Sequence, residues 1–163
     1  HPALTPDRLE AIIRALQLFQ QKTQTFLVLI PFQPTRDWAI ATAIKAQLPD
    51  HSEILSLTDP AQLKGVFTGV EMAIAMRYHG LIMAAASTCR CFAISYDPKV
   101  SRLMEELNLP GWDITALPDT PEALCRAWLQ QYEQGHPVAE EMARSLAHQA
   151  LQHQHILHQY LKQ

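Results

Sequence analysis

The sequence predicts an α/β domain of Rossmann-like build, with a parallel sheet between two layers of helices. Short apolar segments alternate along the chain with segments of helical periodicity. Several of the helical segments open on a capping residue followed by Pro, and the first apolar segment, Phe26–Ile30, is closed by Pro31. The chain of 163 residues has the length of one domain, or of a large part of a two-domain enzyme.

The first half of the chain begins with a predicted helix. Thr5 is suited to cap it, Pro6 to stand in its first turn, and apolar residues then recur at helical spacing as far as Phe19. The uninterrupted apolar run Phe26–Ile30 is typical of a strand covered on both faces in a parallel sheet. The elements expected after it are a helix over residues 37–48, a strand over 53–57 and a brief helix over 58–65.

The second half continues this alternation. The elements expected there are a strand over residues 70–76, a helix over 80–86, a strand over 91–95 and helices over 100–107 and 120–134. The Ala and Met content of residues 70–76 also suits a helix, so both alternatives stay open there. Because Gly135 and Pro137 then interrupt the pattern, we expect a Rossmann-like domain over residues 1–137 and one long helix, rich in Gln and His, over residues 138–163.

The chain opens on a helix, whereas a βα unit opens on a strand whose carboxyl end usually contacts ligand. We therefore expect this chain to be the C-terminal domain of a larger enzyme. A leading strand and an N-terminal partner domain would then lie outside it.

The turn Arg77–Tyr78–His79 is the main candidate for function. It follows a predicted strand and precedes a predicted helix, so it lies at a strand's carboxyl end, where open parallel sheets bind ligands. A helix amino terminus offers free N–H groups to an anion, and Arg77 adds a charged fork that matches a carboxylate or phosphate. His79 adds a group that can donate a hydrogen bond or a proton near neutral pH. The alternative is that Arg77 pairs with a structural carboxylate and His79 belongs to a capped helix start.

A second strand end is expected to line the same crevice. Tyr96 and Lys99 follow the strand over 91–95 and can contact anions or hydroxyl groups. Asp97, which precedes a proline, is equally suited to a structural role as a helix cap. A cap at Asp97 does not exclude a binding role for its two neighbours.

The loop after the first strand supplies weaker candidates. Gln33 and Asp37 lie beyond a carboxyl end as well, so they can face the crevice. Alone this motif is weak, and ordinary turn chemistry explains the segment better.

Several functional classes are disfavoured. The net charge of −3 gives no electrostatic reason to expect nucleic acid or an anionic membrane surface as a partner. The sequence contains no GxGxxG, GxxxxGK[ST] or GxSxG motif, and we expect no cofactor. The histidines near the C-terminus, His148, His155 and His158, do not share one clean helical face, which favours a solvated or docking surface over a metal site.

Cysteine usage and apolar patterning bear on location. The three cysteines, Cys89, Cys91 and Cys125, are too few for a disulfide framework and suit a reducing cytosol. The longest apolar stretch, residues 70–94, is broken by charged and polar residues, which argues against a transmembrane helix. The polar, proline-containing start predicts no signal peptide. We expect a cytoplasmic location, with the inner face of the membrane as a further option.

Two motifs of the chain form a pair: MRYHGLI over residues 76–82, followed closely by two alanines, and ISYDPKV over residues 94–100. Together they resemble the polysaccharide pyruvyl transferase family, in particular the branch that acts on bacterial cell-wall polymers. Tyr78, Gly80 and Ala93 stand where the family more often has Leu, Ala and Gly. The loop over residues 30–33 with Asp37 also fits, and the resemblance spans about residues 5–110.

The resemblance implies a two-domain fold similar to GT-B glycosyltransferases, with this chain as its C-terminal half. It also implies transfer of a pyruvyl group from phosphoenolpyruvate to a saccharide acceptor, as a cyclic ketal on a cell-surface polysaccharide. Arg77 and His79 take the catalytic positions of the MR-x-H motif, with His79 as proton donor or phosphate ligand. The expected substrate-binding residues are Arg77, Tyr78, His79, Tyr96, Lys99 and Gln33.

Two other functions stay open. The first is a GT-B-type glycosyltransferase domain whose crevice binds the diphosphate of a sugar nucleotide, for which the helix amino terminus at Arg77 serves equally well. The second is a non-catalytic binding domain that uses its His-rich helix as the interaction surface.

Overall fold

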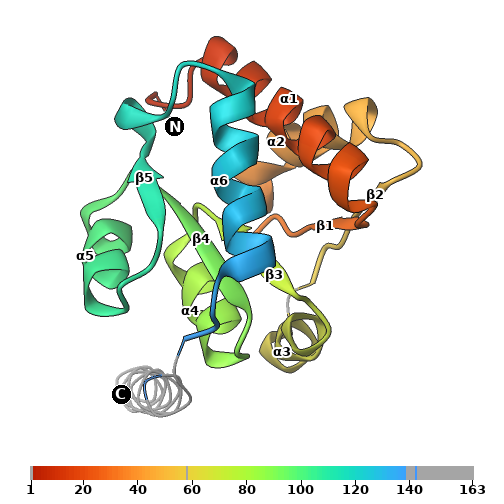
Figure 1. Cartoon of the computed structure of the whole chain (residues 1–163). Coiled ribbons are helices and arrows are strands. Elements are labelled where there is room, and N and C mark those ends of the chain that lie inside the picture. The colour runs from red at the N-terminus through yellow and green to blue at the C-terminus, as the bar shows by residue number, and fades with distance from the viewer. Residues whose placement is uncertain (1, 58, 139–141, 143–163) are drawn as a thin grey trace.

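The computed structural model describes residues 2–57, 59–138 and 142. Helices and strands alternate along this part of the chain, and every paired strand is parallel to its neighbour. In chain order the elements are α1 (Pro6–Thr23), β1 (Leu27–Leu29), α2 (Pro34–Gln47), β2 (Ser52–Ile54), α3 (Pro60–Thr68), β3 (Met72–Ala75), α4 (Tyr78–Ala86), β4 (Arg90–Ser95), α5 (Pro98–Glu106), β5 (Gly111–Asp113), the 3-10 helix η1 (Ile114–Ala116) and α6 (Pro121–Gln134) (Figure 1).

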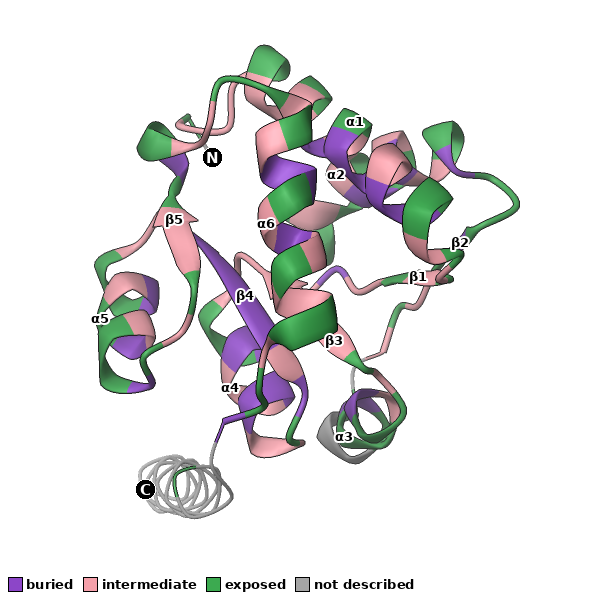
Figure 2. Cartoon of the chain, in the orientation of Figure 1, coloured by how far each residue is buried: buried purple, intermediate pink, exposed green. Residues whose placement is uncertain are grey.

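Strand β4 shows the three layers most clearly. Its side chains alternate between two cores, because successive residues of a strand point to opposite faces. Phe92 and Ile94 lie in a core shared with α1, α2 and α6, whereas Cys91 and Ala93 lie in a second core with α3, α4 and α5. Figure 2 shows β4 buried along most of its length, with helices on either side that are exposed on their outer faces. The predicted Rossmann-like, three-layer α/β fold is therefore confirmed.

Several helices start where the capping residues predict. The side-chain oxygens of Thr5 and Thr120 accept hydrogen bonds from the backbone of α1 and α6, and Pro follows each cap. Asp97 caps α5 in the same way, through a 2.8 Å bond from the backbone N–H of Lys99 to its Oδ1. The structural role expected for Asp97 is confirmed.

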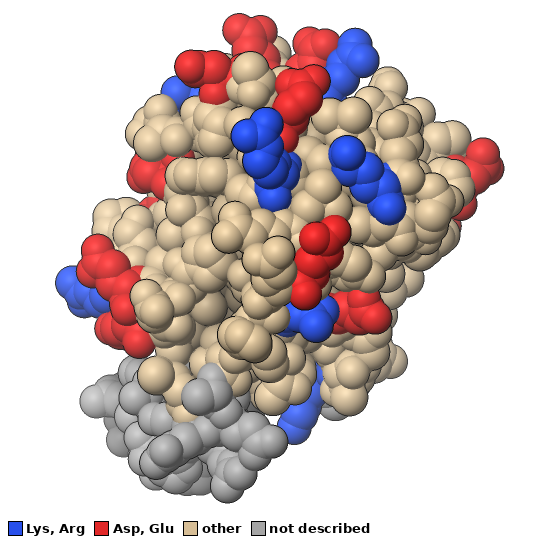
Figure 3. Space-filling view, viewed as in Figure 1, with Lys and Arg blue, Asp and Glu red and all other residues tan. Residues whose placement is uncertain are grey.

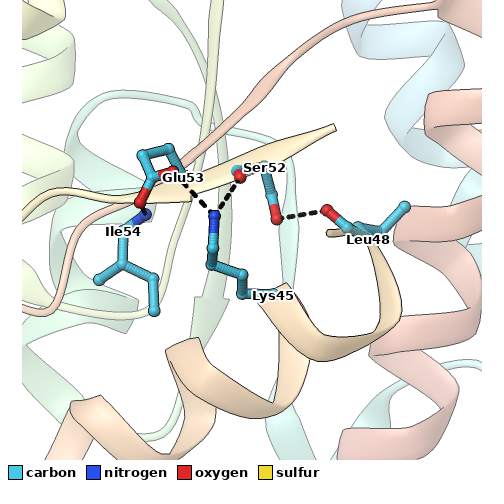
Figure 4. A network of polar contacts seen from close by, with 5 residues as sticks. All are labelled: Lys45, Leu48, Ser52, Glu53 and Ile54. Carbon is cyan, nitrogen blue, oxygen red and sulfur yellow. Dashed lines mark hydrogen bonds and ion pairs between the residues drawn. The ribbon is translucent and has the colours of Figure 1, made fainter. Parts of the chain in front are cut away.

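Strand β2 is fastened to the preceding helix by polar contacts (Figure 4). Lys45, in the last turn of α2, donates from Nζ to the carbonyl oxygen of Ser52 and to Oε2 of Glu53, each at 2.8 Å. The buried hydroxyl of Ser52 donates to the carbonyl oxygen of Leu48 at 2.7 Å. These bonds fix the sharp return from α2 into the sheet edge.

The structure decides one open alternative and differs from the sequence-based expectations in two places. Residues 72–75 form a strand, which decides between the two alternatives for that segment. Strand β5 and η1 were not predicted; Gly111 begins β5, where an added Cβ would collide with the carbonyl oxygen of Ala93. The prediction that the first strand is covered on both faces is wrong, because Phe26 is 59% exposed and Val28 37%. The His- and Gln-rich helix predicted over residues 138–163 lies almost wholly outside the described residues.

Candidate functional site

Arg77 joins β3 to α4 and is the N-cap residue of that helix. Its backbone is extended, and its carbonyl oxygen accepts the helix's first hydrogen bond, from the N–H of Leu81 at 3.0 Å. The side chain of Arg77 makes no capping bond, unlike the side chains that cap α1, α5 and α6. The first N–H groups of α4 therefore face the carboxyl edge of the sheet beside a guanidinium group, without a side-chain acceptor from the cap.

The guanidinium group of Arg77 is held by Asp37, from the first turn of α2. Its Nη2 donates to Oδ1 at 2.5 Å and its Nε to Oδ2 at 3.2 Å, so the pair is bidentate. Both side chains are mostly buried, with 24% and 16% of the surface exposed. The hydrogen bond to Asp37 raises the pKa of Arg77 above its usual value. The sequence alternative in which Arg77 pairs with a carboxylate is thus realised, and the partner is one of the residues expected at the crevice.

Tyr96 completes this cluster from the end of β4. The Cζ atom of Arg77 lies 5.6 Å from the centre of the Tyr96 ring, which is a cation–π distance. Burial raises the pKa of Tyr96. Residues that follow β1, β3 and β4 therefore meet at one point of the carboxyl edge, which is where open parallel sheets bind ligands.

The loop between β1 and α2 is shaped around the Asp37 carboxylate. Gln33 precedes α2 as its N-cap residue, and its backbone N–H donates to Oδ2 of Asp37 at 2.8 Å. The side chain of Gln33 is exposed and makes no capping bond. Gln33 thus positions Asp37 through its backbone.

Close packing brings the same loop against α4. The ring of Phe32 lies so near Gly80 that a Cβ atom there would be 2.9 Å from Phe32 Cε2. Phe32 also stacks on Phe67 of α3, with ring centres 6.5 Å apart. Glycine at position 80 therefore allows the Phe32 ring to approach the start of α4, which brings the two loops of the site together.

The other predicted residues lie at the rim. Tyr78 and His79, in the first turn of α4, are both exposed, and their rings meet edge to face with centres 5.8 Å apart. Lys99 is also exposed, and its backbone N–H donates a hydrogen bond to the side chain of Asp97. The structure thus brings Arg77, Tyr96 and the backbone of Gln33 together around Asp37, while Tyr78, His79 and Lys99 present their side chains to solvent.

A shallow cavity beside Tyr96 was not predicted from the sequence. It has a volume of about 350 Å³ and is lined by Tyr96, Asp97, Pro98, Ser101, Arg102, Glu105 and Asp113. It lies between the carboxyl end of β4 and that of β5, the strand that was not predicted. The residues of β5 are too few to show a period, so no sequence signal pointed to Asp113 as a site neighbour.

Neither a metal-binding cluster nor a membrane-spanning helix is found in the described part of the chain. No group of three or more His, Cys, Asp or Glu residues there is arranged to hold a metal ion, and no helix there is long and apolar enough to cross a membrane. The three cysteines are free and buried. On the face that Figure 3 shows, acidic and basic side chains are interspersed rather than gathered into a patch of one sign.

Comparison with known proteins adds one finding. The model of the polysaccharide pyruvyl transferase family matches residues 2–98, more than half of the chain, including β1, β3 and the whole Arg77–Asp37 contact. Comparisons with curated proteins and with solved structures gave no match.

Proposed function

This chain belongs to the polysaccharide pyruvyl transferase family, and on that premise we propose that its Arg77 site binds phosphoenolpyruvate as the pyruvyl donor. The acceptor is a sugar of a cell-surface polysaccharide, which receives the pyruvyl group as a ketal. One observation carries the proposal: the Arg77 guanidinium is fixed by Asp37 and Tyr96 beside the amino terminus of α4.

The chemistry of that place suits this donor. Phosphoenolpyruvate carries a phosphate and a carboxylate, and the site offers a guanidinium group and helix N–H groups next to each other. Asp37 occupies Nε and one N–H of Nη2, and Nη1 has no hydrogen-bond partner among the described residues. The free edge of the fork binds one anionic group of the donor, while the α4 amino terminus binds the other.

The remaining site residues take roles that follow from their positions. Tyr78 and His79 form the exposed rim over the start of α4, so they contact the donor from the solvent side. Lys99 adds an exposed positive charge from α5, and the exposed Gln33 side chain adds an amide from the loop after β1. Tyr96 lies with its ring against the guanidinium group and holds it in place.

The reaction needs one proton delivered and two removed. A proton from His79 adds to the methylene carbon of phosphoenolpyruvate and leaves positive charge at C2, which one sugar hydroxyl attacks with loss of its proton. The C2–O bond to phosphate then breaks, and a second hydroxyl adds to C2 with loss of its proton. One of these protons restores His79 and the other leaves with phosphate. Arg77 and the α4 amino terminus stabilise the departing dianion.

We propose that an N-terminal domain outside the chain supplies the acceptor site and that the two domains close on the donor in a GT-B-like manner. The enzyme then acts in the cytoplasm, at the inner face of the membrane where the polymer is built, and the free buried cysteines suit that reducing compartment.

Substitutions in the full-length enzyme test the donor site. R77K keeps the charge but loses the fork, and we expect kcat/KM for phosphoenolpyruvate to fall at least about tenfold. H79A should lower kcat on the order of 10²-fold. Exposed residues of the same types provide controls, R126A on α6 and H136A beyond it, and both should leave turnover unchanged. Near-normal turnover of R77K and H79A would contradict the proposal, as would turnover of a sugar nucleotide in place of phosphoenolpyruvate.

A further inference from the structure

The five described strands do not form one continuous sheet. β1 pairs with β2, and β3, β4 and β5 pair in that order, but β1 and β3 are not hydrogen-bonded to each other. All three pairings are parallel, and the two sheets are covered by the same helical layers. The break thus interrupts a single three-layer arrangement (Figure 1).

The strands beside the break are poorly buried compared with β4. Five of the six residues of β4 are buried, whereas all four residues of β3 are of intermediate exposure. β1 has no buried residue. In a complete sheet of this type the central strands are the most covered, so a covering neighbour is missing between β1 and β3.

Each of these two strands has a row of main-chain groups that points into the break. Leu27 donates to the carbonyl oxygen of His51, and the carbonyl oxygen of Leu29 accepts from Leu55, so alternate residues such as Val28 face away from β2. The carbonyl oxygen of Glu71 accepts from Arg90, so Ile74, three residues along, faces away from β4. Unpaired rows of this kind on facing strands are a template for one more strand.

The path of α1 shows where that strand belongs in the chain. α1 begins near the carboxyl edge of the sheet, because Arg8 in α1 is close enough to Asp113, at the end of β5, for their charges to interact. Hydrogen bonds from Thr115 chiefly lower the pKa of Asp113, and the charge of Arg8 lowers it further. Figure 1 shows the N-terminus beside that end of β5. From there α1 runs to Thr23, and the chain enters β1. This is the course of a crossover helix, which connects two parallel neighbours.

We propose that the break between β1 and β3 is a docking slot for one parallel strand, supplied by the polypeptide that leads into α1. The strand order then becomes β2, β1, the docked strand, β3, β4, β5. β1 and β3 have three and four residues, so a strand of about four or five residues fills the slot. It is apolar on both faces, because the cores lie on both sides of it.

The Arg77–Asp37 pair lies at the carboxyl end of the slot. Asp37 follows β1 and Arg77 follows β3, so this ion pair spans the carboxyl end of the slot. The loop from the docked strand into α1 therefore emerges beside the guanidinium group. If the donor site is where we propose, that loop adds main-chain N–H groups to those of α4, and a filled slot tightens donor binding by the chain.

Amide hydrogen exchange followed by NMR tests the slot without any substrate. In the 163-residue chain, we expect the slot-facing amides of Val28 and Ile74 to exchange at least about 10²-fold faster than their ladder-bonded neighbours Leu29 and Ala73. In a chain extended at its amino end by the residues that its own gene encodes there, the slot-facing amides should become as protected as the neighbours. The neighbours serve as internal controls in both samples.

Three results would overturn the proposal. Equal protection of all four amides in the 163-residue chain at every concentration would mean that β1 and β3 pair directly. Protection that rises with protein concentration would assign the slot to a second copy of the chain. Fast exchange that persists in the folded, extended chain would show that the preceding segment does not dock. Because phosphoenolpyruvate takes no part, failure here is separate from failure of the donor site.

Discussion

Replacement of Asp37 by Asn removes the charge that holds Arg77 and keeps the shape of the side chain. The change leaves an acceptor oxygen for the backbone N–H of Gln33, so the start of α2 is preserved. It leaves Arg77 with one neutral acceptor instead of a bidentate carboxylate.

The loss of stability expected for D37N depends on how far the Arg77–Asp37 pair is buried. A hydrogen bond to a charged group contributes about 1.5–3 kcal/mol, and losing the partner of a fully buried ion pair costs about 3–5 kcal/mol. The Arg77 side chain is 24% exposed, so water compensates for part of the loss. We expect D37N to lower the free energy of unfolding by about 2 kcal/mol. D37A also removes the acceptor for Gln33 and should cost about 1 kcal/mol more.

Urea denaturation of the single and double variants measures this directly. In a cycle with R77M, we expect the interaction between the two positions to be at least about 1 kcal/mol, since the partners are in direct contact. Asp50 is exposed and provides the matched control, D50N, with an effect below about 0.5 kcal/mol. Additive effects in the cycle, or a D37N stability equal to that of D50N, would refute the argument that this ion pair organises the site.

Three further predictions concern the fold. S52A should lower the free energy of unfolding by about 1 kcal/mol in the same denaturation assay, because the carbonyl of Leu48 loses the buried Ser52 hydroxyl as a donor and keeps only the 3.2 Å bond from the N–H of His51; an unchanged stability would contradict the contact. G80V should cost about 1–3 kcal/mol by overlap with Phe32, and F32A should recover part of that loss, whereas simple additivity would contradict the packing. Burial raises the pKa of Cys91 to about 12, so the folded thiol stays neutral at a pH where the unfolded thiol ionises. Stability should therefore fall as the pH rises from 8 to 10, by about 1 kcal/mol more in the parent than in C91A; equal losses in the two proteins would contradict this.

The sequence predicted what local patterns determine. Caps such as Thr5 and Asp97 gave the helix starts, because a side chain that accepts from the next turn acts within a few residues. The alternation of predicted strands and helices predicted the three layers. The MR-x-H turn predicted the strand-to-helix junction at Arg77. Each of these signals is contained in a short segment.

The remaining features depend on contacts between distant segments. The pairing of Arg77 with Asp37 joins residues 40 positions apart, and only the fold shows which carboxylate meets the guanidinium group. β5 is three residues long and is held by its register with β4, so it has no periodicity of its own. The exposure of Phe26, just before β1, depends on which distant segments cover that end of the strand, and no local pattern in an apolar segment reveals this.

Binding of phosphoenolpyruvate by Arg77 and the α4 amino terminus can be measured by an NMR titration of the isotope-labelled chain. We expect saturable shifts at the Arg77 side chain and at the amides of Tyr78, His79 and Gly80, weaker shifts with inorganic phosphate, and loss of the effect in R77A. The absence of shifts in the folded chain, or shifts that centre on the cavity near Asp113 and survive in R77A, would contradict it.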